Sequence, residues 1–348
     1  MQKGWGELDK AAGGHKYSHG HALVLVGGIG RGGAGRLAAR GALRVGAGLV
    51  TVGCPGEALM ENAARLDAVM LTRVDSASDL LEFCRDPRVS ALCLGPGLGA
   101  SRARDLVPVA LGLGLATVLD ADALTAFAAR PEELFRLLHP RCLLPPHAGE
   151  FARIFPDLAA AIGATAPDQG HVKGGPGEGN PSDRSAGISG VSGITGMGGA
   201  AGVDGVDGVD GDIRRDIRRD EAVRSAARRC GATVLLKGPR TRIASPDGTL
   251  RPVDAPGDGS AAWLATAGSG DVLAGFCTGL MARGMDPLSA GEVAARLHLE
   301  CGRLAGPGLI AEDLPEVLPQ VLRRILKPSA GLGSVLRPDD DQGTEVGS

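Results

Sequence analysis

The chain has 348 residues, a length that fits one large α/β domain or two small ones. Its 37 lysines and arginines nearly balance its 40 aspartates and glutamates, so the charge gives no reason to expect a nucleic acid partner. No apolar run is long enough to cross a bilayer and no signal peptide opens the sequence, which predicts a cytoplasmic protein without membrane contact. The seven cysteines are scattered without a C-x-x-C pair, which favours reduced core thiols over a disulfide framework or a zinc site.

Short apolar runs alternate with helical patterns along the chain. The predicted strands are His21–Val26, Leu49–Val52, Val89–Leu94, Ala116–Leu119, Cys142–Leu144 and Thr233–Leu236. Helical spacing of apolar residues predicts a helix over Ala34–Val45 and another that starts at Asp271 and stops at Gly284. Repetition of strand and helix predicts a parallel sheet with helices on both faces, and ligands in such sheets bind beyond the carboxyl ends of the strands.

One segment departs from this pattern. Residues 168–219 are rich in glycine, serine, proline and aspartate, with Val-Asp-Gly repeated over 203–211 and Asp-Ile-Arg-Arg repeated over 212–219. The run lacks the distal glutamate of an EF-hand loop and does not form the nonapeptide calcium repeat, so calcium binding is not favoured. Its low apolar content predicts a disordered insertion, and we expect the same for residues 1–14 and 328–348.

The first glycine cluster has the form of a dinucleotide-binding fingerprint. Residues Gly28–Gly33 match G-x-G-x-x-G between a predicted strand and a helix. A dinucleotide fold also needs an acid at the end of the next strand, and Val50–Pro55 contains none. A nicotinamide-dependent oxidoreductase is therefore not favoured. The turn can still meet a ligand through its backbone amides, and Ala34 at the helix start allows close approach.

The stretch Trp263–Gly275 joins a glycine-rich loop to a helix and places one carboxylate, Asp271, at the junction. A helix N-terminus has unpaired N–H groups and a partial positive charge, and glycines let a phosphate come close to both. An acid at this place can take the proton from a hydroxyl that attacks the phosphate. The alternative is that Asp271 only caps the helix and the glycines form a tight turn.

Other polar residues follow the predicted strands. Asp120 and Asp122 can serve a magnesium ion or cap the next helix. His147 and Glu150 form an H-x-x-E pair that is either half of a metal site or a helix-capping pair, and no third ligand is evident.

Lys237 ends the last predicted strand, where it can hold a nucleotide or be an ordinary surface lysine. His15, His19 and His21 lie close together in the sequence and fit surface and strand-start positions better than a metal site.

Seven short motifs follow one another in the chain, most of them at predicted strand ends. They are His15-Lys16 with Gly20-His21; Gly33-Ala34 with Arg44–Val50; Gly95–Gly99; Asp120–Leu124; Pro146–Glu150; Lys237-Gly238 with Thr241; and Ala267–Asp271. In this order the chain resembles the ADP-dependent NAD(P)H-hydrate dehydratases, which have the ribokinase-like fold. The resemblance implies a three-layer α/β/α sandwich with a mostly parallel central sheet over residues 15–327, interrupted by the insertion.

The resemblance also implies the reaction and the roles of individual residues. Members of that family restore NADH and NADPH from the hydrates NADHX and NADPHX, consuming ADP and releasing AMP and phosphate. The implied substrate-binding residues are Ala34, Gly97, Gly99, His147 and Asp271, with Asp271 as the catalytic base. The implied nucleotide-binding residues are Lys237, Gly238, Pro239, Arg240, Thr241 and Gly270, and the amides of Gly268, Ser269 and Gly270 are expected to stabilise the transferring phosphoryl group. Magnesium is expected as a cofactor, with ligands that the sequence does not identify.

The sequence departs from the family pattern in three places. The loop before Trp263 lacks the expected asparagines, and Pro239-Arg240 replaces smaller residues. Many relatives carry an N-terminal epimerase domain, whereas about fourteen residues precede His15 here; a separate epimerase or a fragment of a longer protein would account for this. Family membership further suggests a homo-oligomer.

Two alternatives to the dehydratase are an ATP-dependent kinase of a small alcohol on the same fold and a nucleotide-binding module without activity. The loop Gly95–Gly99 together with Pro146–Glu150 favours the dehydratase over the kinase. The fold alone does not decide, since ribokinase-like proteins act on many substrates.

Overall fold

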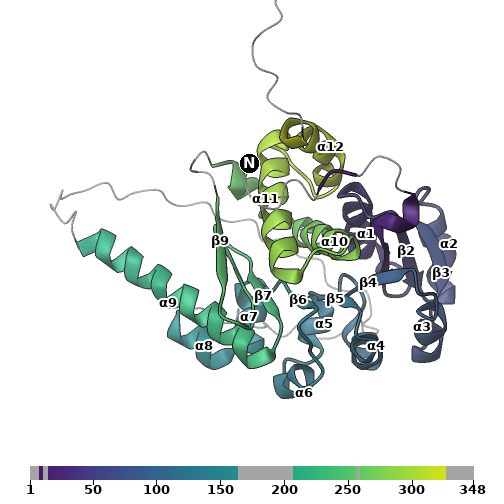
Figure 1. Ribbon diagram of the computed structural model, residues 1–348, viewed down its shortest axis with the longest axis horizontal. Coiled ribbons are helices and arrows are strands. Elements are labelled where there is room, and N and C mark those ends of the chain that lie inside the picture. The colour runs from purple at the N-terminus through teal and green to yellow at the C-terminus, as the bar shows by residue number, and fades with distance from the viewer. Residues whose placement is uncertain (1–7, 11–14, 164–206, 256, 258, 327–348) are drawn as a thin grey trace, which may run out of the picture.

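Nine strands form one mixed sheet in the order β3-β2-β1-β4-β5-β6-β7-β8-β9 among the residues that the computed structural model describes, which are 8–10, 15–163, 207–255, 257 and 259–326 (Figure 1). The strands are β1 (His21–Leu25), β2 (Leu49–Cys54), β3 (Met70–Arg73), β4 (Val89–Leu94), β5 (Ala116–Leu119), β6 (Cys142–Leu144), β7 (Thr233–Leu236), β8 (Arg240–Ala244) and β9 (Leu250–Asp254). All pairings from β3 to β7 are parallel, and β8 and β9 add antiparallel strands at one edge.

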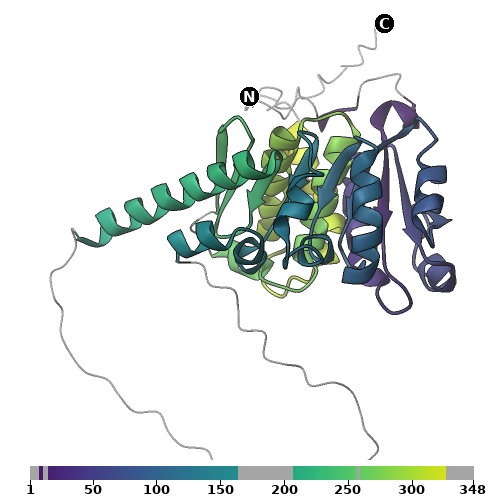
Figure 2. The same cartoon turned by 90° about the horizontal axis from the view of Figure 1, so that it is seen from below.

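Helices cover both faces of this sheet. They are α1 (Gly32–Arg44), α2 (Leu59–Ala63), α3 (Ala77–Phe83), α4 (Ala100–Gly112), α5 (Asp122–Thr125), α6 (Pro131–Phe135), α7 (Ala148–Ile154), α8 (Pro156–Ala161), α9 (Asp207–Cys230), α10 (Ser269–Ala282), α11 (Pro287–Ala305) and α12 (Asp313–Leu326), with short 3-10 helices at Lys16–His19, Gly56–Ala58 and Ser260–Leu264. One layer contains α1, α10, α11 and α12, and the other contains α3 to α9 (Figures 1 and 2). The predicted three-layer α/β/α architecture is confirmed.

Two hydrophobic clusters fill the space between the sheet and its helices. Along β1 the side chains of Ala22 and Val24 enter the cluster under α1 and α10, while Leu23 and Leu25 enter the cluster on the opposite face. This alternation follows from the two-residue repeat of a strand that is buried on both sides. The central parallel strands are therefore continuous apolar runs, which is why they could be recognised in the sequence.

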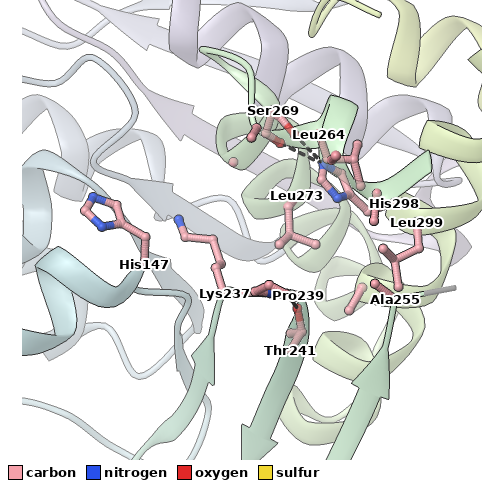
Figure 3. A pocket seen from close by; sticks show the side chains of 16 residues that line it. His147, Lys237, Pro239, Thr241, Ala255, Leu264, Ser269, Leu273, His298 and Leu299 are labelled. Carbon is pink, nitrogen blue, oxygen red and sulfur yellow. Dashed lines mark hydrogen bonds between the residues drawn. The ribbon is translucent and has the colours of Figure 1, made fainter. Parts of the chain in front are cut away.

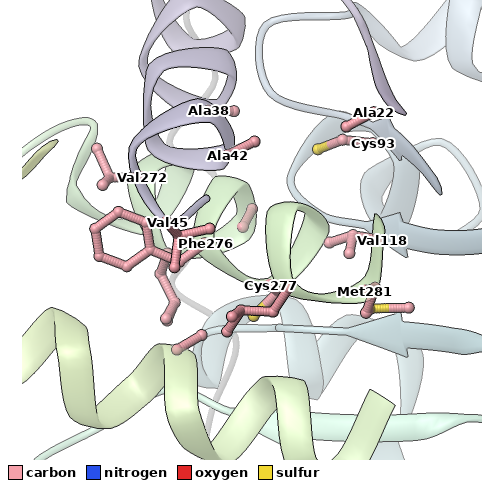
Figure 4. Close-up of a cluster of buried hydrophobic side chains, with 14 of the residues drawn as sticks. Ala22, Ala38, Ala42, Val45, Cys93, Val118, Val272, Phe276, Cys277 and Met281 are labelled. Carbon is pink, nitrogen blue, oxygen red and sulfur yellow. The ribbon is translucent and has the colours of Figure 1, made fainter. Parts of the chain in front are cut away.

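The helices α1 and α10 pack very closely (Figure 4). A Cβ added at Gly275 would lie 2.1 Å from the carbonyl oxygen of Ala38, and one at Gly279 would lie 2.5 Å from that of Ala42. Only glycine at these two positions lets the backbones approach this far. The contact fixes the start of α10, where Asp271 lies, relative to α1.

The structure differs from the sequence prediction at the sheet edge and in the insertion. Six strands were predicted close to their observed bounds, but β3, β8 and β9 were not. Residues 207–219, placed in the disordered insertion, form the first part of α9. Ion pairs with β8 stabilise this helix in spite of its low apolar content. The rest of the predicted insertion lies outside the described residues.

Part of the predicted N-terminal tail is also ordered. Leu8 is buried in the cluster under α1 and α10, and the carbonyl oxygens of Leu8 and Asp9 accept hydrogen bonds from Arg283. Residues 1–7, 11–14 and 328–348 lie outside the described part of the chain. Within that described part, no helix has the length and apolar character that a bilayer span requires. All seven cysteines are free, and six are buried in the core as predicted.

Candidate active site

The N-terminus of α10 is built around glycine. Gly268 is the N-cap and has a φ of +86°, in the left-handed region that favours glycine. A Cβ there would lie 2.7 Å from Cδ1 of Leu37 and 2.9 Å from Cβ of Ala311. Asp271 is therefore not the N-cap, as one alternative had it; it follows in the first turn of the helix. Its carboxylate is free for another role beside the unpaired N–H groups of the helix start.

The electrostatic environment of Asp271 suits a proton acceptor. Burial, together with the negative charge of Asp120 and a smaller contribution from Asp122, raises the pKa of Asp271 to about 6, although Lys237 acts in the opposite direction. A carboxylate with this pKa is ionised at neutral pH and is a stronger base than an exposed aspartate. Perturbed carboxylates of this kind cluster at functional sites.

Lys237 at the end of β7 meets Asp120 at the end of β5. The Nζ atom of Lys237 donates to Oδ1 and Oδ2 of Asp120 at 2.9 and 3.2 Å and lies 3.9 Å from Oε2 of Glu150. Burial opposes the ammonium charge, but the attraction of Asp120 and Glu150 outweighs it and raises the pKa of Lys237. A Cβ on Gly270 would stand 3.3 Å from this Nζ atom, so the cation also borders the start of α10.

His147 and Glu150 form a capping box at the start of α7. The backbone N–H of Gly149 donates to Nδ1 of His147 at 3.0 Å, and the N–H of His147 donates to Oε2 of Glu150 at 2.9 Å. The helix-capping alternative for this pair is therefore confirmed. Burial and the charge of Asp120 raise the pKa of Glu150 to about 7, against the opposing effect of Lys237. The other ring nitrogen of His147, Nε2, lies 3.5 Å from Oε1 of Glu150.

The predicted substrate-binding residues Ala34, Gly97 and Gly99 lie in the loops beyond β1 and β4. The strand order reverses at this point, which is where open α/β sheets bind ligands. The N–H of Gly27 donates to the carbonyl oxygen of Gly97 at 3.1 Å, and Cβ of Ala34 lies 3.5 Å from where a Cβ on Gly97 would stand. The N–H of Gly99 donates to Oδ2 of Asp122 at 2.8 Å, so this aspartate holds the glycine loop.

A cavity of about 530 Å³ opens between β7, β8 and the start of α10 (Figure 3). It brings together seven of the predicted residues, namely His147, Lys237, Gly238, Pro239, Thr241, Ser269 and Gly270. Its apolar wall consists of Ala255, Ala261, Ala262, Leu264, Ala265, Leu273, Ala295 and Leu299. Neither Arg240 nor Gly268 is among the lining residues, and Arg240 is instead paired with Asp254 and Asp216 at 3.2 and 3.9 Å.

His298 in α11 lines the same cavity and was not predicted. Its Nε2 atom lies 3.0 Å from both the carbonyl oxygen and Oγ of Ser269 (Figure 3). Because a carbonyl oxygen only accepts, Nε2 carries the proton, and Ser269 keeps its hydroxyl proton for another acceptor. Burial lowers the pKa of His298 to about 4, so the ring is neutral at physiological pH. The only sequence signal was a histidine among apolar helix positions.

The described residues contain no group of three or more histidine, cysteine, aspartate or glutamate side chains arranged to hold a metal ion. Of the N-terminal histidines, His15 caps a 3-10 helix, and His21 is buried at the start of β1 with Nε2 2.8 Å from Oγ1 of Thr51. These are the surface and strand-start positions that were predicted.

Comparison with solved structures places this architecture among the ribokinase-like proteins. The chain is similar to a ribokinase-like superfamily protein from Enterococcus faecalis, with a TM-score of 0.61 and 18% identity over 94% of this chain and 96% of that one. It is also similar to the ADP/ATP-dependent NAD(P)H-hydrate dehydratase from Bacillus subtilis, with a TM-score of 0.63 and 24% identity over 91% of this chain and 94% of that one. These similarities define the fold as a ribokinase-like α/β/α sandwich.

Sequence comparison identifies the family within that fold. The family model described as NAD(P)H-hydrate dehydratase matches residues 22–171 and 209–326. The bifunctional NAD(P)H-hydrate repair enzyme Nnr of Moorella thermoacetica is 33% identical over 93% of this chain, and that of Synechocystis sp. is 32% identical over 90% of it. The chain belongs to the NAD(P)H-hydrate dehydratase family. It spans about half the length of these curated relatives, 54% and 51%.

Proposed function

We propose that this protein dehydrates the S-epimer of hydrated NADH and NADPH back to the reduced nucleotide, with ADP converted to AMP and phosphate. The observation that carries the proposal is the place of Asp271. Its half-buried carboxylate, with a pKa raised to about 6 by desolvation and Asp120, follows the glycine turn at the start of α10. Asp271 is not itself among the residues that line the cavity, but its chain neighbour Gly270 is, and the charges of Asp120, Lys237 and Asp122 act on it.

The chemistry follows from the weakness of hydroxide as a leaving group. Asp271 accepts the proton of the ring hydroxyl while the hydroxyl oxygen attacks the terminal phosphorus of ADP. The bond between that phosphorus and the bridging oxygen breaks, and AMP leaves. The ring nitrogen then expels phosphate, and loss of a proton from the adjacent carbon restores the double bond. The N–H of Gly270 stabilises the negative charge on the transferring phosphoryl group, whereas the N–H of Ser269 donates to the carbonyl oxygen of Thr266 at 3.3 Å.

The cavity supplies the nucleotide side of this reaction. Lys237 and the turn that follows it border the start of α10, so the phosphates bind where a cation and helix N–H groups face the same space. Leu264, Leu273 and Leu299 give the apolar surface that a purine base needs. Ser269, held by His298, presents its hydroxyl proton to a phosphate oxygen.

Magnesium is part of the proposal as a partner of the nucleotide. The Bacillus subtilis dehydratase was co-crystallised with ATP and Mg²⁺. Magnesium at nucleotide sites uses one or two carboxylates, waters and phosphate oxygens, and therefore needs no cluster of three protein ligands. Asp120 and Glu150, beside Lys237, are the carboxylates that fit this requirement. When bound, the magnesium ion would neutralise part of the negative charge of the nucleotide phosphates.

The first experiment is an assay of the purified chain with hydrated NADH, magnesium and ADP, following the return of reduced-nicotinamide absorbance. We expect recovery that depends on ADP, together with release of AMP and phosphate in equal amounts. A stable phosphorylated product would instead identify a small-alcohol kinase. Nucleotide binding without turnover in folded protein would identify a silent binding module. The preference for ADP over ATP is read from the same assay with each nucleotide.

Three expectations stay predictions: the cytoplasmic location, the homo-oligomer, and a separate epimerase that converts the other epimer into the S-epimer. Gel filtration with light scattering tests the oligomer. Adding a known epimerase to the assay tests the last prediction, because recovery from a mixture of epimers should then increase.

A further inference from the structure

The repeated Asp-Ile-Arg-Arg motif has no role in the proposed chemistry, yet the structure pairs it with β8, a strand that contributes Thr241 to the cavity wall. A four-residue repeat puts every fourth side chain on one helix face. In α9 this spacing brings the carboxylates of Asp216, which starts the second copy of the repeat, and Asp220, which directly follows the repeat, to the side chain of Arg242 in β8. Figure 2 shows α9 projecting from the body of the molecule, with its C-terminal part packed against the sheet edge.

Arg242 is a buried charge that these two aspartates neutralise. Its side chain is 4% exposed, its Nε donates to Oδ1 of Asp220 at 2.7 Å, and its Nη2 donates to Oδ1 of Asp216. Its Nη1 donates to the carbonyl oxygen of Arg240 at 3.0 Å. Each of these is a charge-assisted hydrogen bond, and a buried guanidinium without such partners would be costly. We call Asp216, Asp220, Arg240 and Arg242 the α9–β8 ion-pair network.

The network and the cavity lie on opposite faces of the same strand. Side chains alternate along β8, so Arg242 faces α9 while Thr241 between the two arginines faces the cavity. Oγ1 of Thr241 donates to the carbonyl oxygen of Gly238 at 3.2 Å, which ties the strand to the turn after Lys237. Arg240 also reaches Asp254 in β9 at 3.2 Å. A shift of β8 relative to α9 would therefore move the cavity wall.

We propose that Asp216 and Asp220 are positioning residues that set the place of the nucleotide-binding turn 237–241 through Arg242. The inference rests on the proposed function, and it gives the repeat a role in ADP affinity. It also reassigns Arg240, which does not line the cavity, from contact with the nucleotide to the α9–β8 ion-pair network.

The test compares two ways of breaking the network with one matched control. Asp216→Asn with Asp220→Asn removes both negative charges and leaves Arg242 buried without them. Arg242→Met instead removes the buried cation and leaves Asp216 and Asp220, whose side chains are 44% and 20% exposed, to be solvated by water, so it keeps the test open if the first variant does not fold. Asp157→Asn breaks another aspartate–arginine pair of α9, in which Asp157 accepts two bonds of 2.7 Å from Arg229, away from the cavity lining. Each full-length variant is assayed for ADP binding by calorimetry and for KM and kcat.

We expect both network variants to raise the Kd and KM for ADP by roughly fivefold to tenfold with kcat within about twofold, the pattern of lost ground-state binding. Asp157→Asn should leave all three constants unchanged. Unaltered ADP affinity in folded network variants overturns the inference, as does an equal loss in Asp157→Asn. If the wild-type chain binds ADP without turnover, the proposed function fails and the calorimetry still decides the positioning role. If it does not bind ADP, both fail.

Discussion

Two elements that border the cavity, α10 and β8, are held in place by different forces. Of the fourteen residues of α10, twelve are buried, and two glycines bring its backbone against α1. In contrast, β8 lies near the sheet edge, and its arginines form ion pairs with α9 and β9. Close packing holds α10, whereas β8, which is also hydrogen-bonded to β7 and β9, is held in part by charge. The position of α10 should therefore be sensitive to changes of side-chain volume, and that of β8 to changes of side-chain charge.

The largest expected effect concerns the catalytic role at the central element. Asp271→Asn should lower turnover by at least about a hundredfold with the fold intact, since it removes a general base. Asp286→Asn is the matched control, because Asp286 caps α11 by accepting from the N–H of Ser289 at 3.0 Å. It should leave both the stability and kcat nearly unchanged, because asparagine caps a helix about as well as aspartate. Near-normal turnover in Asp271→Asn would rule out the assigned role.

The pH dependence of kcat/KM gives a second test of Asp271 as the base. Only the ionised carboxylate accepts a proton, and the pKa of Asp271 is raised to about 6 by burial and Asp120. The value of kcat/KM should therefore fall about tenfold per pH unit below pH 6. Glu150→Gln is the control, since the pKa of Glu150 is raised to about 7. If the fall of kcat/KM at low pH disappears in this variant, the titrating group is Glu150 and not Asp271.

An added methyl group at Gly275 tests whether close packing against α1 holds α10 in place. Gly275→Ala would place a Cβ 2.1 Å from the carbonyl oxygen of Ala38, so α10 must move away from α1. We expect a loss of about 1–3 kcal/mol in the free energy of unfolding, measured by denaturant titration. Gly112→Ala in α4 is the control, because no atom lies within 4 Å of the added Cβ. Equal stability of the two variants would contradict the close packing.

The smallest effect concerns the exposed charges of the edge. Asp157→Asn should cost about 0.2–1 kcal/mol, because ion pairs in water are weak. The pKa of Asp157 is lowered to about 2 by Arg229, so the pair contributes stability above the ordinary pKa of aspartate and loses it as pH falls toward 2. Thermal melting at pH 7 and pH 3 checks this: the difference between wild type and variant should shrink at the lower pH. A difference that grows would show that the pair does not stabilise the fold.

The same contrast explains what the sequence could predict. The central strands are apolar on both faces, so runs such as Val89–Leu94 were recognised with their observed bounds. The edge strand β9 reads Leu-Arg-Pro-Val-Asp, which has no apolar run to recognise. The helical part of the repeat depends on Arg242, a partner more than twenty residues away in the chain. Local patterns cannot contain that information.

The residues of the candidate site also differ in whether local sequence patterns could predict their positions. The glycines and acids at strand ends were found because parallel strands deliver their carboxyl ends to one edge. His298 was missed because its role depends on a contact with Ser269 across 29 residues. The lack of contact between Arg240 and the cavity was equally hidden, since it follows from the pairing of that side chain with Asp216 and Asp254.

The packing of α1 against α10 has a consequence for biosynthesis. Arg283, just after α10, donates to the carbonyl oxygen of Val45 at 3.1 Å, across 238 residues of sequence. During translation α1 therefore leaves the ribosome long before its partner exists, with the small apolar side chains of Ala38 and Ala42 uncovered. Nascent chains and truncated products that end before α10 expose this surface, and such surfaces promote aggregation. The cover of α1 by α10 and the arrival of Asp271 are therefore one event in the synthesis of this protein.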